Sequence, residues 1–238
     1  MKQGTSIAPW NYTGCLSLWS MEGVRGSTWE SLNQRSPAAF LISGGLLLAS
    51  PVTKGFTLVA DVSPPGWLVA LFVFPALVTA LAGVLGLYPK LVKQTPRLAL
   101  AGSVIAVVAA SGLSLLFGWI LASHLVPSLA ELTGTAPPGW VFLSMMVLIP
   151  TGFALFGVAS LRATIHSRSI GLLLLGFAVP WVVILAVTPV YGSALPGWLA
   201  FAVYSPMPIT LLATGYSLRD ESAVTDPETT QRSLPIGF

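Results

Sequence analysis

The sequence predicts an all-α membrane protein with six transmembrane helices. Hydrophobic residues make up 54% of the chain and charged residues only 8%, about a third of the fraction usual in soluble domains. The mean hydropathy of +0.82 comes from long apolar stretches that short polar segments separate. Long stretches without charge are typical of helices that cross a lipid bilayer.

The first 36 residues are polar and mixed in composition. They contain no apolar stretch of the signal-peptide type, so we expect no cleavage, and we expect residues 1–36 to be poorly ordered. Met21 is an alternative start, because every long apolar stretch lies after it.

The predicted membrane domain comprises residues 37–217, and its first span is residues 37–53. Ser36 is expected as the N-cap of this span and Pro37 as its first helical residue. The span is the shortest, because Pro51 and Lys54 arrive after about 16 residues, near the lower limit for crossing about 30 Å of hydrocarbon. The other spans carry no Asp, Glu, Lys, Arg or His, and they are predicted at residues 66–88, 98–122, 140–161, 170–190 and 197–217.

The distribution of basic residues predicts the orientation of the chain. If the N-terminus is inside, all of the 11 Lys and Arg residues except Lys54 fall on the cytoplasmic side. Trp67, Trp140 and Trp198 then fall at the outer interface, where tryptophan is enriched. We therefore expect a multi-pass plasma-membrane protein with both termini cytoplasmic. Residues 218–238 are acidic and poor in apolar side chains, which predicts a disordered cytoplasmic tail.

The tripeptide Pro-Gly-Trp indicates an internal repeat. It begins at Pro65, Pro138 and Pro196, and each copy opens an even-numbered span. A proline follows within each of these spans, and the odd-numbered spans share an arginine and then a glycine near their start. We interpret the pattern as three tandem helical hairpins in a parallel, pseudo-threefold bundle. The alternative is that turn and interface preferences alone produce the likeness.

The third span carries small residues at every fourth position, namely Gly102, Ala106, Ala110, Ser114, Gly118 and Ala122. Such a face lets another helix approach closely, which predicts a central place for this span. Mid-span prolines, at Pro75, Pro150, Pro180 and Pro206, are expected to kink their helices. We expect hydroxyls such as that of Thr151 to satisfy the freed carbonyls, and substrate coordination by those carbonyls is the alternative.

Most familiar chemistries lack the residues that they need. No span contains an ionisable residue that could relay protons, and the chain has a single cysteine, Cys15. His124 and His166 fall on opposite sides of the membrane, which excludes a shared metal or haem. Zinc-protease and phosphate-loop motifs are missing. We therefore expect no catalytic residue, no metal, no cofactor and no nucleic-acid partner.

One inner loop carries the only candidate contact residues, Arg162, His166 and Arg168. Such a basic cluster can contact anionic lipid headgroups or a phosphate. The simpler interpretation is that these residues only orient the chain in the membrane.

Two stretches resemble uncharacterised polytopic membrane proteins of haloarchaea. The first comprises Gly86-Leu-Tyr-Pro-Lys through Arg97-Leu-Ala-Leu-Ala-Gly102, and the second Phe156-Gly-Val-Ala-Ser-Leu-Arg162 through Ser167-Arg-Ser-Ile-Gly-Leu-Leu-Leu-Leu-Gly176. The resemblance implies a similar helical fold of about six spans and an archaeal plasma membrane. It implies no activity and no binding residue. The eight Asp and Glu residues are fewer than halophilic proteins usually carry.

These observations leave three functional hypotheses. The first is a non-enzymatic structural or accessory protein, whose partners are membrane lipid, another membrane subunit or a second copy of itself. The second is a permease or channel for a neutral or apolar solute, which would need a polar cavity reaching the midplane. The third, an enzyme acting at the inner interface through His166, has the least support.

Overall fold

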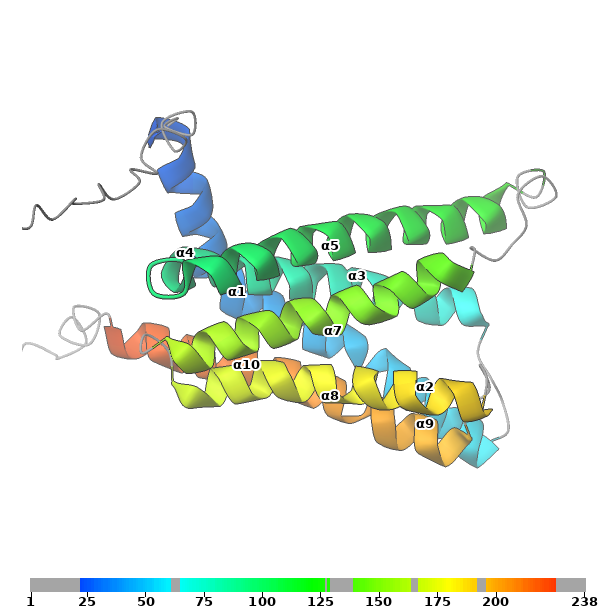
Figure 1. Ribbon diagram of the computed structural model, residues 1–238. Coiled ribbons are helices and arrows are strands. Elements are labelled where there is room, and N and C mark those ends of the chain that lie inside the picture. Colours follow the sequence, from blue (N-terminus) through cyan, green and yellow to red (C-terminus); the bar gives the residue numbers. More distant parts are fainter. Residues whose placement is uncertain are drawn as a thin grey trace, which may run out of the picture.

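The computed structural model describes residues 22–60, 65–126, 128, 139–163, 167–191 and 196–225, which form helices and short turns (Figure 1). The helices are α1 (Glu22–Leu47), α2 (Ala49–Ala60), α3 (Gly66–Gly86), α4 (Tyr88–Leu91), α5 (Pro96–Leu125), α7 (Gly139–Arg162), α8 (Arg168–Tyr191), α9 (Gly197–Tyr204) and α10 (Pro206–Thr225). Six segments are long and apolar enough to cross a membrane: Ser31–Ala60, Gly66–Leu91, Pro96–Leu125, Gly139–Arg162, Arg168–Val187 and Gly197–Glu221. The described chain is thus all-helical, and its six apolar segments indicate a membrane-embedded, multi-pass protein.

The first span extends further in both directions than the sequence predicted. Ser36 lies inside α1 and not at its N-cap. Hydrogen bonds from Leu48 N–H to the Gly44 carbonyl and from Val52 N–H to the Leu48 carbonyl join α1 to α2. Lys54 does not end the helix, because its side chain is exposed and a long lysine stem can reach the membrane interface.

The sixth span is broken in the middle and extended at its end. A bend at Ser205 separates α9 from α10, at the predicted Pro206. Helix α10 continues through residues 218–225, which the sequence predicted to be part of a disordered tail. Leu218 is buried, and Glu221 accepts a hydrogen bond from the Ser167 N–H, so tertiary contacts hold this stretch as helix. Residues 1–21 and 226–238 lie outside the described residues.

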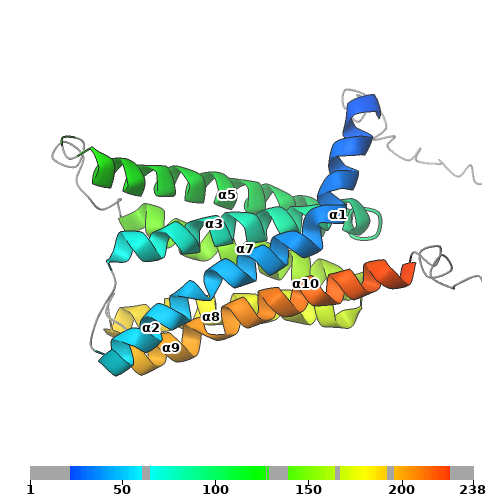
Figure 2. The ribbon, with the colours of Figure 1, turned by 180° about the vertical axis from the view of Figure 1, so that it is seen from behind.

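The six spans pack in chain order. Each contacts the span before it and the span after it, and α10 returns to pack along α1 (Figures 1 and 2). At one end of the bundle, which we call the basic end, α1, α5 and α8 begin and α3, α7 and α10 end. The described Lys and Arg residues other than Lys54 lie in helices, or in the turn between α4 and α5, at the basic end: Arg25, Arg35, Lys90, Lys93, Arg97, Arg162, Arg168 and Arg219. We call the opposite end the Lys54 end.

Helices α1 and α3 are joined by two buried hydrogen bonds. The Ser36 hydroxyl donates to the Gly83 carbonyl and the Ser43 hydroxyl donates to the Ala76 carbonyl, each over 2.7 Å. The two serines are seven residues apart, as are their two acceptors, so the bonds fix one antiparallel register along both helices. In lipid, hydrogen bonds and close packing of this kind replace the hydrophobic drive for helix association.

The predicted central place of the third span is wrong. Only 22% of the residues in its most apolar 18-residue stretch are buried, the smallest share among the six spans. Gly102 packs against the Phe156 ring on α7, but a Cβ added at Gly118 would have nothing within 4 Å. The smooth face of α5 is therefore used for packing near the basic end and left open toward the Lys54 end.

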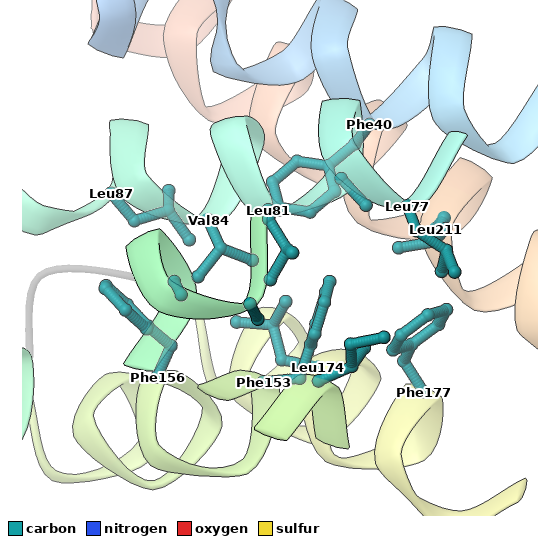
Figure 3. Close-up of a cluster of buried hydrophobic side chains, with 14 of the residues drawn as sticks. Phe40, Leu77, Leu81, Val84, Leu87, Phe153, Phe156, Leu174, Phe177 and Leu211 are labelled. Carbon is teal, nitrogen blue, oxygen red and sulfur yellow. The ribbon is translucent and has the colours of Figure 1, made fainter. Parts of the chain in front are cut away.

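Large apolar side chains fill the half of the bundle near the basic end (Figure 3). Phe40 of α1 packs against Gly83 of α3, and Phe153 of α7 lies 4.3 Å from Phe177 of α8 between ring centroids. These three phenylalanines are 0% exposed. Leu81, also fully buried, projects from α3 into the same cluster (Figure 3). The basic half therefore has a close-packed core to which α1, α3, α7 and α8 contribute side chains.

Candidate functional site: an apolar cavity at the Lys54 end

A cavity of about 310 Å³ lies in the other half of the bundle. Side chains of α2, α3, α5, α7, α8 and α9 line it, and most of them are apolar. On α3 the lining runs from Gly66 to Leu77, and on α7 from Phe142 to Ile149. Below Leu77 on the same helix, Leu81 and Val84 are fully buried in the core of the basic half. The cavity is therefore a blind pocket that opens toward the Lys54 end.

The floor of this cavity coincides with the level of the prolines. On five of the six lining helices, the lining residue nearest the basic end is within two positions of a proline: Ser50, Leu77, Ile149, Trp181 and Tyr204 neighbour Pro51, Pro75, Pro150, Pro180 and Pro206. Proline removes one helical hydrogen bond and favours a bend. The breaks between α1 and α2 and between α9 and α10 occur at this same level. We infer that these bends separate the helices above the floor, whereas the straight segments below it pack tightly.

The cavity offers few polar groups. Lys54 and Ser50 lie one turn apart on α2, and Tyr204 ends α9. The Lys54 side chain is exposed, whereas Ser50 is buried. Trp181 is 6% exposed, and its indole N–H is buried without a hydrogen-bond partner among the described residues. A mostly apolar pocket with a few polar groups is the usual form of a small-molecule site.

A second, smaller cavity of about 30 Å³ continues from the floor. It shares Ser50, Trp181 and Tyr204 with the larger cavity and is closed by Leu47 and Met207. This space exceeds the roughly 10–15 Å³ that one water molecule needs. It stops at the core, so it does not extend the cavity to the basic end.

The Thr151 hydroxyl does not satisfy the carbonyl that Pro150 frees. The Thr151 hydroxyl donates to the Val147 carbonyl at 2.6 Å, but the carbonyl without its helical donor, four residues before Pro150, belongs to Met146. The expectation for Thr151 is therefore wrong, because a threonine hydroxyl reaches the carbonyl four residues before its own position.

The inner loop predicted to contact headgroups is placed only in part. Arg162 ends α7 and Arg168 begins α8, both with exposed side chains, whereas His166 lies outside the described residues. The Glu221 carboxylate accepts the Ser167 N–H at 2.7 Å. A carboxylate from α10 therefore already occupies the amide next to the start of α8, where an anion would otherwise be favoured. Headgroup contact by Arg162, His166 and Arg168 remains a prediction.

Sequence reasoning did not locate the cavity. Only the recurring mid-span prolines pointed to its level, and they were interpreted as kinks. Within the described residues, no group of three His, Cys, Asp or Glu side chains could hold a metal. Comparisons with protein-family models, with curated proteins and with solved structures gave no match.

Proposed function

We propose that this chain is a non-enzymatic, multi-pass protein of the plasma membrane that holds a lipid-like apolar molecule in the cavity at its Lys54 end. The observation that carries the proposal is the blind, apolar cavity of about 310 Å³ above a close-packed core. No Asp, Glu, His or Cys of the described residues lines the cavity, which favours binding over catalysis. Lipid is thus the partner that the proposal names, with no cofactor and no nucleic acid.

The proposal includes orientation and architecture. The described Lys and Arg residues, apart from Lys54, lie at the end of the bundle where the chain enters and leaves it. This distribution supports cytoplasmic termini, because Lys and Arg are enriched on the cytoplasmic side of membranes. Packing in chain order supports three tandem hairpins around a pseudo-threefold axis. The three hairpins are not fully equivalent, as the glycine that follows the mid-span proline of each even-numbered span shows. Gly157 and Gly215 contact the next hairpin, whereas Gly83 contacts Phe40 of its own hairpin. The likeness to haloarchaeal membrane proteins is part of the same proposal.

The alternative, a permease or channel for a neutral solute, needs a path through the basic half. Fully buried phenylalanines and leucines fill that half among the described residues. A path for solute through the basic half would require these side chains to rearrange, and no observation favours that.

A cavity-filling substitution tests the proposal. Ala70 lines the cavity on α3, so Ala70→Phe places a ring inside it. Ala101 is exposed on α5, away from the cavity lining, so Ala101→Phe adds the same ring where lipid surrounds the helix. Native mass spectrometry of the full chain released from nanodiscs would measure retained lipid. We expect wild type and Ala101→Phe to retain lipid and Ala70→Phe to lose most of it.

Two results would overturn the proposal. The first is equal lipid retention by Ala70→Phe and Ala101→Phe, with both variants folded by circular dichroism. The second is saturable movement of a neutral solute such as glycerol into proteoliposomes that contain the wild-type protein, because a blind pocket conducts nothing.

A further inference from the structure

The molecule that fits this cavity has one charged end, and the position of Lys54 sets its sign. Lys54 lines the cavity one helical turn above Ser50 and has an exposed side chain, and it is the one Lys or Arg of the described residues outside the basic end. No carboxylate among the described residues pairs with it. An ammonium group at the rim of an apolar pocket favours an anionic group placed above an apolar body.

The depth of the cavity fits a hydrocarbon chain of one leaflet. Its lining on α3 runs over twelve residues, from Gly66 to Leu77, and the eleven steps between them correspond to about 16 Å at the helical rise. This is about half of the roughly 30 Å hydrocarbon layer. A lipid chain that starts at the level of Gly66 would therefore end at the floor, where Leu77 and Ile149 are apolar. The exposed side chain of Lys54, whose backbone lies one turn above Ser50 of the floor, can extend toward that start.

The hydroxyl of Ser50 adds a second polar contact on the same face of α2. Ser50 and Lys54 are four residues apart, so they lie one above the other and both line the cavity. The opposite walls are apolar, with Phe74 of α3 stacked on Phe117 of α5 at 5.7 Å between ring centroids. A few polar groups in a mostly apolar lining are the arrangement that an amphipathic molecule requires.

We propose that the cavity selects an anionic lipid of the membrane leaflet at the Lys54 end, with its headgroup at Lys54 and one hydrocarbon chain in the pocket. This inference rests on the proposed function and adds the charge of the ligand to it. An exposed ion pair is modest in strength, so we expect a preference of about two- to fivefold for anionic lipid.

The test compares phosphatidylglycerol with phosphatidylcholine of identical chains, both present in nanodiscs with the full-length protein. Native mass spectrometry then gives the ratio of the two lipids retained. Wild type should retain phosphatidylglycerol about two- to fivefold over phosphatidylcholine. Lys54→Gln should bring the ratio close to one, and Lys54→Arg should keep the wild-type ratio. Lys93→Gln, which removes an exposed lysine at the basic end, should also keep it.

A ratio that is the same in wild type and Lys54→Gln would overturn the inference. If Ala70→Phe still abolishes retention in that case, the cavity binds lipid without selecting its charge, and only the proposed function survives. Palmitate added to the nanodiscs tests whether a carboxylate can replace the phosphate headgroup as the source of negative charge. Displacement of phosphatidylglycerol by palmitate, but not by hexadecanol, would support an anionic headgroup site, and equal displacement by both would count against it.

Discussion

The crossing of α7 and α8 allows a quantitative prediction, because the two backbones are in contact there. A Cβ added at Gly157 would lie 3.0 Å from the Gly171 carbonyl oxygen and 2.9 Å from Leu175 Cγ. A Cβ added at Gly171 would likewise lie 3.0 Å from the Gly157 carbonyl oxygen. A leucine side chain can adjust to such a contact, but a helix backbone can do so only if the helices separate. Gly157→Ala should therefore weaken this crossing.

Two opposing terms set the size of the effect. Overpacking costs about 1–3 kcal/mol, and a rigid backbone contact belongs at the upper end of that range. Alanine recovers about 1 kcal/mol of helix propensity relative to glycine. We expect Gly157→Ala to lose about 1–2 kcal/mol of the free energy of unfolding. Gly118→Ala is the matched control and should gain up to about 1 kcal/mol, because nothing lies within 4 Å of the added methyl group.

Unfolding of both variants by sodium dodecyl sulfate in mixed micelles, followed by far-ultraviolet circular dichroism, would measure the difference. The expected gap between Gly157→Ala and Gly118→Ala is about 1–3 kcal/mol. Equal stability of the two variants would refute the packing of α7 on α8 described above. A Gly157→Ala variant more stable than wild type would do the same.

Three further predictions follow from contacts between the spans. Ser43→Ala removes an interhelical hydrogen bond and should cost about 1 kcal/mol in the same titration, whereas Ser103→Ala removes only a bond within α5 and should be near neutral. Glu221→Ala should raise the hydrogen-exchange rate of the Ser167 amide about fivefold, and an unchanged rate would remove α10 from that contact. Phe153→Ala, at a fully buried position, should cost about 3–5 kcal/mol in the titration, and a loss below about 1 kcal/mol would mean that the core of the basic half is loosely packed.

The sequence predicted the number and approximate bounds of the spans, because apolar length is a property of local composition. Local sequence also marked the helix starts at Gly66, Gly139 and Gly197, each of which directly follows the proline of a Pro-Gly-Trp tripeptide. It was less successful where packing overrides local signals. Ser36 has the composition of an N-cap, yet its hydroxyl bonds the Gly83 carbonyl. Residues 218–225 are polar, yet Leu218 is buried against neighbouring spans.

The candidate site shows the same division. The sequence singled out Lys54 as the exception to the positive-inside distribution, and it predicted kinks at the mid-span prolines. That Ser50, Leu77, Ile149, Trp181 and Tyr204 meet at one level depends on how five helices align. No local pattern in the sequence encodes that alignment.

Apolar length and the placement of charge determined by themselves that this chain crosses a membrane, because transfer of each side chain into lipid depends on that side chain and its neighbours in the chain. The tertiary structure alone decided that one half of the bundle is filled and the other is hollow. Packing depends on which side chains oppose one another across helices: phenylalanines are buried together on one side of the proline level, and the cavity lies on the other.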